Sequence, residues 1–331
     1  MLIVLPGAVG DVVRGLPLLG RLRHAWPQAR IGWAVEHPSA PLLESHPWLD
    51  VVHVLARRSG LPSFVRFLAV LRRERYDLAL DLGRGLKSAC MVRASGAPRR
   101  VGLHRSDARE GSWLAANEQL PPQGVATPKL LQFVAFAEHL GVPPAPIDFG
   151  LVPTPAEVRA ADTLLEGLAP PIVVASVGSS CPSRYWWPAR TAAVLDALAE
   201  RQGASAVLTG TAADAEFARA VARHMRAPVR DLVGRTSLRE LVAVLARAAA
   251  VFGPDSGALH VAAAVGVPVV SLWGATSAER STPWGQERGV VRGEAPCAPC
   301  FLRDCPIGRV CMRAIDVDTV TERVATMLRA A

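Results

Sequence analysis

The chain has 331 residues, of which 50% are hydrophobic and 20% charged, and its formal net charge is +8. A chain of this length is expected to divide into two domains of roughly 150 residues, each with its own core. Lys87 and Lys129 are its only lysines, so scattered arginines carry most of the positive charge. The sequence lacks the lysine-rich blocks and aromatic-interleaved basic runs of a nucleic-acid binder. Anionic small molecules or a negatively charged membrane surface suit it better as partners.

No segment is predicted to direct the chain into or across a membrane. The first apolar run has no basic residues before it and is broken by Pro6 and Gly7, unlike a signal peptide. The apolar stretches of the second half are interrupted by Arg247, or by Gly266 and Pro268. They therefore fall short of the roughly 20 residues that a membrane span needs. We expect a cytoplasmic protein.

Short β-branched runs alternate with amphipathic helical patterns, which predicts parallel sheets with crossover helices. The proline-dense segment Gly141–Val158 is expected to link an N-terminal domain, residues 1–152, to a C-terminal domain, residues 153–331. Both are predicted to be doubly wound α/β sheets, with ligands bound in the cleft between them. The predicted strands, in chain order, are Leu2–Leu5, Ile31–Val35, Val51–Leu55, Leu78–Leu82, Ile172–Ser176, Ala206–Thr209, Ala250–Phe252 and Val267–Leu272.

The first predicted strand runs into LPGAVGDVV, a glycine-rich turn that leads into a helix. A turn of this kind usually cradles a phosphate, yet here Asp11 follows Gly10. The glycines lack the G-x-G-x-x-G spacing of a dinucleotide site, and a carboxylate would repel a phosphate. One structural alternative is that Asp11 is only the N-cap of the first helix.

The stretch VFGPDSGALHVAAAVG has the layout of strand, small polar residues and helix. Asp255 or Ser256 is expected to cap a helix over Ala258–Val265. Free N–H groups at the helix start form an anion site, which Gly257 lets a phosphate approach closely and to which His260 could donate. The structural alternative is that Asp255 only caps the helix and His260 packs beneath it.

A second stretch, ASVGSSCPSRYWWPAR, repeats this layout between a strand ending at Ser176 and a helix beginning near Trp187. Ser179 and Ser180 offer hydroxyls and free N–H groups, and Arg184 adds a cation. Hydroxyl donors beside a cation suit a diphosphate. The structural alternative is a surface loop with an ordinary solvated arginine.

Four cysteines crowd together in CAPCFLRDCPIGRVC, namely Cys297, Cys300, Cys305 and Cys311. In a reducing compartment such crowding indicates a metal site before it indicates disulfides. Four thiolates could bind structural zinc or an iron–sulfur cluster, although their spacing resembles neither a paired-knuckle zinc ribbon nor a common ferredoxin run. Buried free thiols and a single disulfide pair stay open as alternatives.

Four stretches together closely resemble the ADP-heptose:lipopolysaccharide heptosyltransferases, glycosyltransferase family 9. They are GDVVRGLPLLGRLRHAWPQARIGWAVE, SSCPSRYWWP, DLVGRTSLRELVAVLARAAAVFGPDSGALHVAAAVGVPVVSLWG and CAPCFLRDCPIGRVCM. The resemblance runs from Leu2 to about Ile315. It implies a GT-B fold of two Rossmann-like domains, with the donor bound by the C-terminal domain and the acceptor by the N-terminal one. It also implies inverting transfer without a catalytic metal.

The resemblance also implies residue roles. Asp11 matches the family's general base, which removes the proton from the acceptor hydroxyl as that hydroxyl attacks the anomeric carbon. Arg184 replaces a lysine that is common at its position, which keeps the charge and changes its geometry. No acid stands within Leu208–Ala212, where some members contact the nucleoside. The residues that match the donor diphosphate site are Ser179, Ser180, Arg184, Asp255, Ser256, Gly257 and His260.

The implied activity is the transfer of heptose from ADP-L-glycero-D-manno-heptose to the lipopolysaccharide inner core, without a required cofactor. The final C-M-x-x-I pattern is more similar to the second heptosyltransferase. The enzyme would act peripherally at the inner face of the cytoplasmic membrane. One alternative is a family 9 enzyme with a different nucleotide sugar or acceptor. The other is a non-catalytic sugar-nucleotide or glycan-binding protein with a GT-B shell, against which Asp11 and the donor residues argue.

Overall fold

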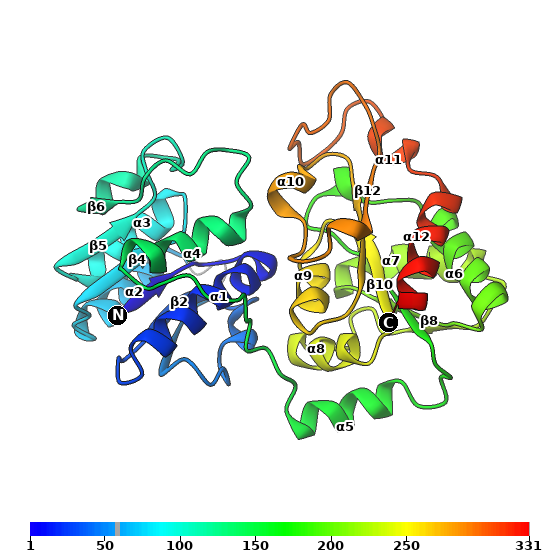
Figure 1. Cartoon of the computed structure of the whole chain (residues 1–331), viewed down its shortest axis with the longest axis horizontal. Helices are drawn as coiled ribbons and strands as arrows, with labels where there is room; N and C mark the ends of the chain where they lie inside the picture. Colours follow the sequence, from blue (N-terminus) through cyan, green and yellow to red (C-terminus); the bar gives the residue numbers. More distant parts are fainter. Residues whose placement is uncertain (57–59, 331) are drawn as a thin grey trace. The chain divides into compact units, whose positions relative to one another are not determined.

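The computed structural model describes residues 1–56 and 60–330, which form two compact units, Met1–Leu151 and Val152–Ala331 (Figure 1). The units divide inside the proline-dense segment Gly141–Val158, one residue before the boundary that the sequence predicts. This segment has no regular structure until α5 (Pro155–Leu164) begins.

Unit 1 contains a six-stranded parallel sheet in the order β3-β2-β1-β4-β5-β6. The central strand β1 is fully buried, as is usual for parallel strands covered on both faces. The strands are β1 (Leu2–Val4), β2 (Gly32–Glu36), β3 (Val51–Leu55), β4 (Leu78–Asp81), β5 (Arg99–Gly102) and β6 (Glu118–Gln119). The helices are α1 (Val9–Ala25), α2 (Leu61–Arg73), α3 (Leu86–Ser95) and α4 (Lys129–His139).

Unit 2 contains a second six-stranded parallel sheet, in the order β12-β11-β10-β7-β8-β9. Its strands are β7 (Ile172–Ser176), β8 (Ser205–Thr209), β9 (Val229–Asp231), β10 (Ala250–Pro254), β11 (Val269–Trp273) and β12 (Val290–Arg292). After α5 its helices are α6 (Pro188–Gln202), α7 (Ala215–His224), α8 (Leu238–Ala246), α9 (Gly257–Ala264), α10 (Ala278–Ser281), α11 (Val310–Ala314) and α12 (Val317–Ala330).

The predicted fold class, α/β with two doubly wound parallel sheets, is confirmed. All eight predicted strands are present, with ends that differ by at most two residues. The strands β5, β6, β9 and β12 were not predicted, and they lie toward the edges of the two sheets. These strands are short and carry charged residues, as in the sequences RRVG, EQ, VRD and VVR. Edge strands need no continuous apolar run, so the pattern that reveals a buried strand is missing.

Each sheet has a switch point, where the chain returns to the middle and continues toward the other edge. In unit 1 this point lies between the neighbouring strands β1 and β4, and in unit 2 between β7 and β10. Loops that leave two such strands diverge to opposite sides of the sheet and leave a crevice beyond the carboxyl ends. The loops after β1, β4, β7 and β10 are therefore the places to look for a site.

None of the helices formed by residues 1–56 and 60–330 has both the length and the apolar character that crossing a bilayer requires.

Candidate active site

The loop after β1 places Asp11 in the first turn of α1. The helix begins at Val9 with Ala8 as its N-cap, so Asp11 is the third helical residue. The alternative that Asp11 is the N-cap is therefore wrong. A carboxylate in the first turn is favourable toward the helix dipole, but it is not required to close the backbone there.

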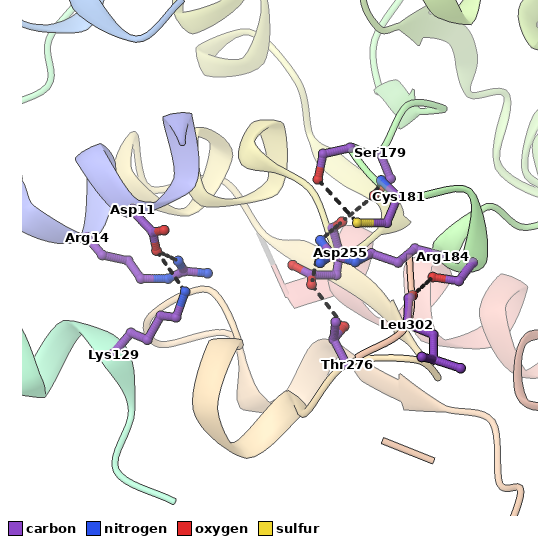
Figure 2. A network of polar contacts seen from close by, with 11 residues as sticks. Asp11, Arg14, Lys129, Ser179, Cys181, Arg184, Asp255, Thr276 and Leu302 are labelled. Atoms are coloured by element: carbon purple, nitrogen blue, oxygen red, sulfur yellow. Dashed lines mark hydrogen bonds and ion pairs between the residues drawn. The ribbon is translucent and has the colours of Figure 1, made fainter. Parts of the chain in front are cut away.

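Two cations contact the same oxygen of Asp11 (Figure 2). Arg14 Nη1 donates to Asp11 Oδ1 at 2.5 Å, and Lys129 Nζ, at the start of α4, donates to it at 3.1 Å. Among the described residues, no hydrogen bond or ion pair reaches Oδ2. The Asp11 side chain is 24% exposed, so this second oxygen is available to a ligand.

Burial acts on Asp11 against its two cations. Burial alone would raise the pKa of Asp11, but the charges and hydrogen bonds of Lys129 and Arg14 outweigh it. The pKa therefore lies below the ordinary value of 3.8. The carboxylate is ionised at neutral pH, which is the state in which it can accept a proton.

Asp255 joins the loops after β7 and β10 in unit 2. It is buried directly after β10, and its Oδ2 accepts a hydrogen bond from Thr276 Oγ1 at 2.9 Å. The same oxygen lies 3.1 Å from Arg184 Nη1, and the Asp255 carbonyl accepts from Ser179 Oγ at 3.0 Å (Figure 2). Because β7 and β10 are adjacent and parallel, their carboxyl ends meet at one edge, where these contacts form.

The start of α9 lies beside this network. Ser256, not Asp255, is the N-cap residue, and its side chain makes no capping hydrogen bond. Its hydroxyl lies 3.3 Å from that of Ser176, at the end of β7. Gly257 is the first helical residue, and His260 is buried within the helix. The alternative in which Asp255 only caps α9 is wrong, because its carboxylate contacts Thr276 and Arg184 instead.

The structure connects three of the seven predicted donor residues through direct contacts. Ser179, Arg184 and Asp255 share hydrogen bonds and an ion pair. Ser180 is exposed, and its hydroxyl lies 3.8 Å from Cys181 Sγ, away from these contacts. Arg184 Nε is buried and has no hydrogen-bond partner among the described residues. Arg184 therefore has a donor to spare after pairing with Asp255.

Lys129 and Arg14 were not identified as site residues from the sequence. Arg14 stands three residues after Asp11, a spacing that brings side chains together on a helix, so that signal was present. Lys129 is 118 residues from Asp11, and no local pattern indicates their contact. Its rarity, as one of two lysines in the chain, was the only hint.

Asp214 is the acid that follows the Leu208–Ala212 stretch. Its Oδ2 accepts hydrogen bonds from Thr211 N at 2.8 Å and Thr211 Oγ1 at 2.7 Å, and its Oδ1 accepts one from the Tyr185 hydroxyl. Burial, with Asp214 adding to it, raises the pKa of Tyr185 to about 12, so the phenol stays a donor. Asp214 thus fixes Tyr185, the neighbour of Arg184.

The zinc or iron–sulfur site at the four crowded cysteines stays a prediction, and the thiols of Cys297, Cys300 and Cys305 lie near enough to Cys311 to add to burial in raising the pKa of its thiol. Across residues 1–56 and 60–330, no group of three or more His, Cys, Asp or Glu side chains has the arrangement to hold a metal ion. Cys311 packs into the hydrophobic core of unit 2, and burial raises the pKa of its thiol. Cys305 Sγ accepts the backbone N–H of Arg309 at 3.2 Å. Cys297, Cys300, Cys305 and Cys311 are all free thiols.

The cysteine-rich segment contacts the loop that carries Arg184. Ser183 N donates to the Arg303 carbonyl at 3.0 Å, and Ser183 Oγ donates to the Leu302 carbonyl at 2.6 Å. Arg309 Nη1 donates to the Tyr185 carbonyl at 2.8 Å. The segment therefore holds both neighbours of Arg184 in place.

A parallel α/β sheet with hydroxyls, a cation and an open helix start at its switch point is typical of nucleotide-binding enzymes. Unit 2 has this arrangement, and unit 1 presents a carboxylate at the equivalent place. The sequence profile of glycosyltransferase family 9 (heptosyltransferase) matches residues 64–311. The chain belongs to this family and is a glycosyltransferase, as its sequence predicts.

Named relatives resemble the chain over most of its length. Lipopolysaccharide heptosyltransferase 1 of Pseudomonas aeruginosa is 28% identical, with 92% of this chain and 87% of that protein covered. Lipooligosaccharide heptosyltransferase 2 of Haemophilus influenzae is also 28% identical, with 88% of each covered. The structure of E. coli heptosyltransferase WaaC with ADP superposes with a TM-score of 0.79 at 22% identity, covering 98% of this chain and 99% of that one. This similarity confirms the GT-B fold class.

Proposed function

We propose that the protein is an inverting glycosyltransferase that moves heptose from ADP-heptose to the lipopolysaccharide inner core, in the manner of heptosyltransferase II. The names of its relatives support heptose as the sugar and lipopolysaccharide as the acceptor. The WaaC structure, which contains ADP, supports adenosine diphosphate as the leaving group. The 28% identity to both a heptosyltransferase 1 and a heptosyltransferase 2 leaves the choice of heptosyltransferase II to the C-M-x-x-I pattern.

The proposal depends mainly on one observation, which is that the two carboxylate oxygens of Asp11 differ in their hydrogen-bond partners. Its Oδ1 is held by two cations, and its Oδ2 has no partner among the described residues. In the proposed reaction the acceptor hydroxyl gives its proton to Oδ2, and its oxygen forms a bond to the anomeric carbon. The bond from that carbon to the diphosphate breaks, and the diphosphate leaves with the electron pair. Asp11 is thus the general base.

An inverting course fits the charges around Asp11. Retaining transfer by double displacement needs a second carboxyl group near the reacting carbon, as in retaining glycosidases. The charged groups that act most strongly on the pKa of Asp11 are both cations, Lys129 and Arg14. A single displacement, for which one base is enough, is therefore the reaction that unit 1 supports best.

The donor diphosphate is assigned to the loops after β7 and β10. Arg184 supplies a fixed positive charge, and Ser256 and the first N–H groups of α9 supply hydrogen-bond donors, while the Ser179 hydroxyl donates to the Asp255 carbonyl beside them. These groups stabilise the charge that develops on the leaving diphosphate, which is the role that a metal ion plays in metal-dependent transferases. We therefore propose transfer without a catalytic metal.

The acceptor is a membrane lipid, so we propose that the enzyme binds peripherally to the cytoplasmic face of the inner membrane. Its net charge of +8 favours contact with an anionic lipid surface. Vesicle sedimentation at rising salt concentration tests this proposal. Release by salt is expected, and equal binding to neutral vesicles would contradict it.

A second candidate is a family 9 enzyme that uses another nucleotide sugar. It is favoured by the engagement of Asp214, which leaves the stretch Leu208–Ala212 without an acid to contact a nucleoside. Melting temperatures with ADP, UDP and GDP separate the two candidates, because a ligand that binds only the folded state raises the melting temperature. A rise with ADP alone, and a heptosylated product by mass spectrometry, are expected. A rise with UDP alone would favour the second candidate.

A further inference from the structure

Lys129 is the long-range partner of Asp11. Arg14 belongs to the same helix as Asp11, and its pairing follows from the three-residue spacing. Lys129 comes from α4, a helix that packs against α1, and it reaches Asp11 only because the unit has folded. The ion pair therefore ties the starts of two helices together at the loop after β1.

The geometry of the contact gives the two oxygens of the Asp11 carboxylate different roles. Both cations donate to Oδ1, which fixes the plane of the carboxylate and keeps a proton off that oxygen. The ammonium group has three donors and no acceptor, so it cannot compete for the proton that the acceptor releases. Oδ2 is then the oxygen to which the proton of the acceptor hydroxyl can pass.

We propose that Lys129 is a positioning residue of the transfer reaction, which orients Asp11 through Oδ1 and keeps it ionised so that Oδ2 takes the proton from the acceptor. This inference rests on the proposed role of Asp11 as the general base. It adds to the reaction a residue that lies 118 positions further along the chain than Asp11. It also assigns different roles to the two carboxylate oxygens of Asp11.

The charges around Asp11 determine the direction in which its pKa moves when Lys129 is replaced. The groups acting on Asp11 are burial, which raises its pKa, and Lys129 and Arg14, which lower it. Arg14 comes from α1 and Lys129 from α4, and among the described residues these two cations are the charged groups that act most strongly on the pKa. Without Lys129, burial is opposed by one cation instead of two. The pKa of Asp11 must then rise.

The experiment compares Lys129→Met with Lys129→Arg and with Lys87→Met. Lys87 is the other lysine of the chain, and it pairs with Glu36 at 2.6 Å on the surface. We expect Lys129→Met to move the acidic limb of the kcat/KM profile to higher pH, with about a tenfold loss on that limb for each pH unit moved. Lys129→Arg should restore most of the profile, and Lys87→Met should keep the wild-type one.

Two further readouts separate this inference from the proposed function. Carboxyl ¹³C NMR titration gives the pKa of Asp11 directly, whether or not the protein is active with ADP-heptose. A raised pKa in Lys129→Met, with unchanged ADP affinity and melting temperature, supports the inference. An unmoved acidic limb and an unmoved Asp11 pKa would overturn it, even if kcat fell. If Asp11→Asn retains full activity, the proposed role of Asp11 as the general base is wrong. That failure belongs to the proposed function and not to the contact between Lys129 and Asp11.

Discussion

The two units share one topology and present opposite charges at equivalent places. In strand order, β1 and β4 of unit 1 correspond to β7 and β10 of unit 2. The loop after β1 presents the carboxylate of Asp11, held by cations. The loop after β7 presents the guanidinium of Arg184, held by a carboxylate. The comparison teaches that topology decides where a site lies, whereas a few side chains decide which chemistry it supports.

The acid at the end of β4 and the acid directly after β10 also differ in their partners. Asp255, after β10, accepts from Thr276 and pairs with Arg184. Asp81, at the end of β4, is buried, and within the described residues it has no ion-pair partner and no hydrogen-bond partner for its Oδ1. The unit assigned to the donor therefore has a paired acid at this place, and the unit assigned to the acceptor has a lone one.

The largest expected effect comes from removing the charge that distinguishes unit 1. Asp11→Asn keeps the size of the side chain, but the amide cannot accept the proton of the acceptor hydroxyl. General-base contributions commonly reach about 10²–10⁴-fold, so we expect kcat to fall by that order. The donor KM and the ADP affinity should change little, because the residues proposed to bind the donor belong to unit 2. Steady-state kinetics with calorimetry measures both, and a near wild-type kcat would end the claim that Asp11 is the base.

The sequence predicted the middle of each unit better than its surroundings. Apolar runs in the sequence predict the buried central strands, and the polar residues that follow β1, β7 and β10 can be identified directly after these runs. Asp11, Ser179, Arg184 and Asp255 were therefore within reach. Lys129 was not, because its contact with Asp11 depends on how α4 packs against α1, which no local pattern encodes. The cysteine spacing suggested a metal, which stays a prediction, but it gave no sign that Cys311 packs into the hydrophobic core.

The next effect tests the charge that distinguishes unit 2. Arg184→Ala removes the fixed cation of the proposed donor site and leaves Asp255 without its ion-pair partner. A charge-assisted hydrogen bond is worth about 1.5–3 kcal/mol, so ADP affinity should fall roughly tenfold to a hundredfold. Adding Asp255→Asn should recover part of the loss, because the unpaired carboxylate would otherwise repel the diphosphate.

The matched control for Arg184 is Arg201→Ala, which breaks the exposed ion pair with Glu322 in the same unit. Calorimetry with ADP should give a wild-type affinity for this control. If Arg184→Ala also binds ADP normally, the donor assignment fails at this position. If Asp255→Asn weakens the double variant further, Asp255 contributes to binding by more than its pairing with Arg184.

The lone acid of unit 1 predicts a dependence of stability on pH. Burial raises the pKa of Asp81 to about 7, against an ordinary 3.8, while the Ser88 hydroxyl and the Gly83 N–H oppose the shift. The folded state keeps the proton that the unfolded state loses, so stability falls as the pH rises between these values. The loss is at most about 1.4 kcal/mol per pH unit.

Asp81→Asn removes this titration, so the variant should gain stability relative to the wild type as the pH is raised from 4 to 8. Melting temperatures across this range measure the difference. A constant difference between Asp81→Asn and the wild type at every pH would show that Asp81 does not titrate in the folded protein.

The smallest effect concerns how the helices of the two units begin. None of the N-cap side chains of α1, α2, α3 and α4 makes a capping hydrogen bond. In unit 2, Thr154 with Glu157 and Ser237 with Glu240 form capping boxes at α5 and α8. Losing such a cap costs about 1 kcal/mol. We therefore expect Ser237→Ala to lower the free energy of unfolding of unit 2 by about 1 kcal/mol, and with it the denaturation midpoint.

Thr326→Ala is the control for Ser237→Ala. Its exposed hydroxyl donates to the Glu322 carbonyl within α12 and caps nothing, so its removal should change stability by less than the loss of the cap. Denaturant titration of both variants, followed by tryptophan fluorescence, provides the comparison. ADP affinity in native buffer should be unchanged in both, because the hydrogen bonds of these residues lie within α12 or at the start of α8. Equal midpoints for Ser237→Ala and Thr326→Ala would mean that the capping box at α8 adds nothing to the stability of unit 2, and that the two units do not differ in this respect.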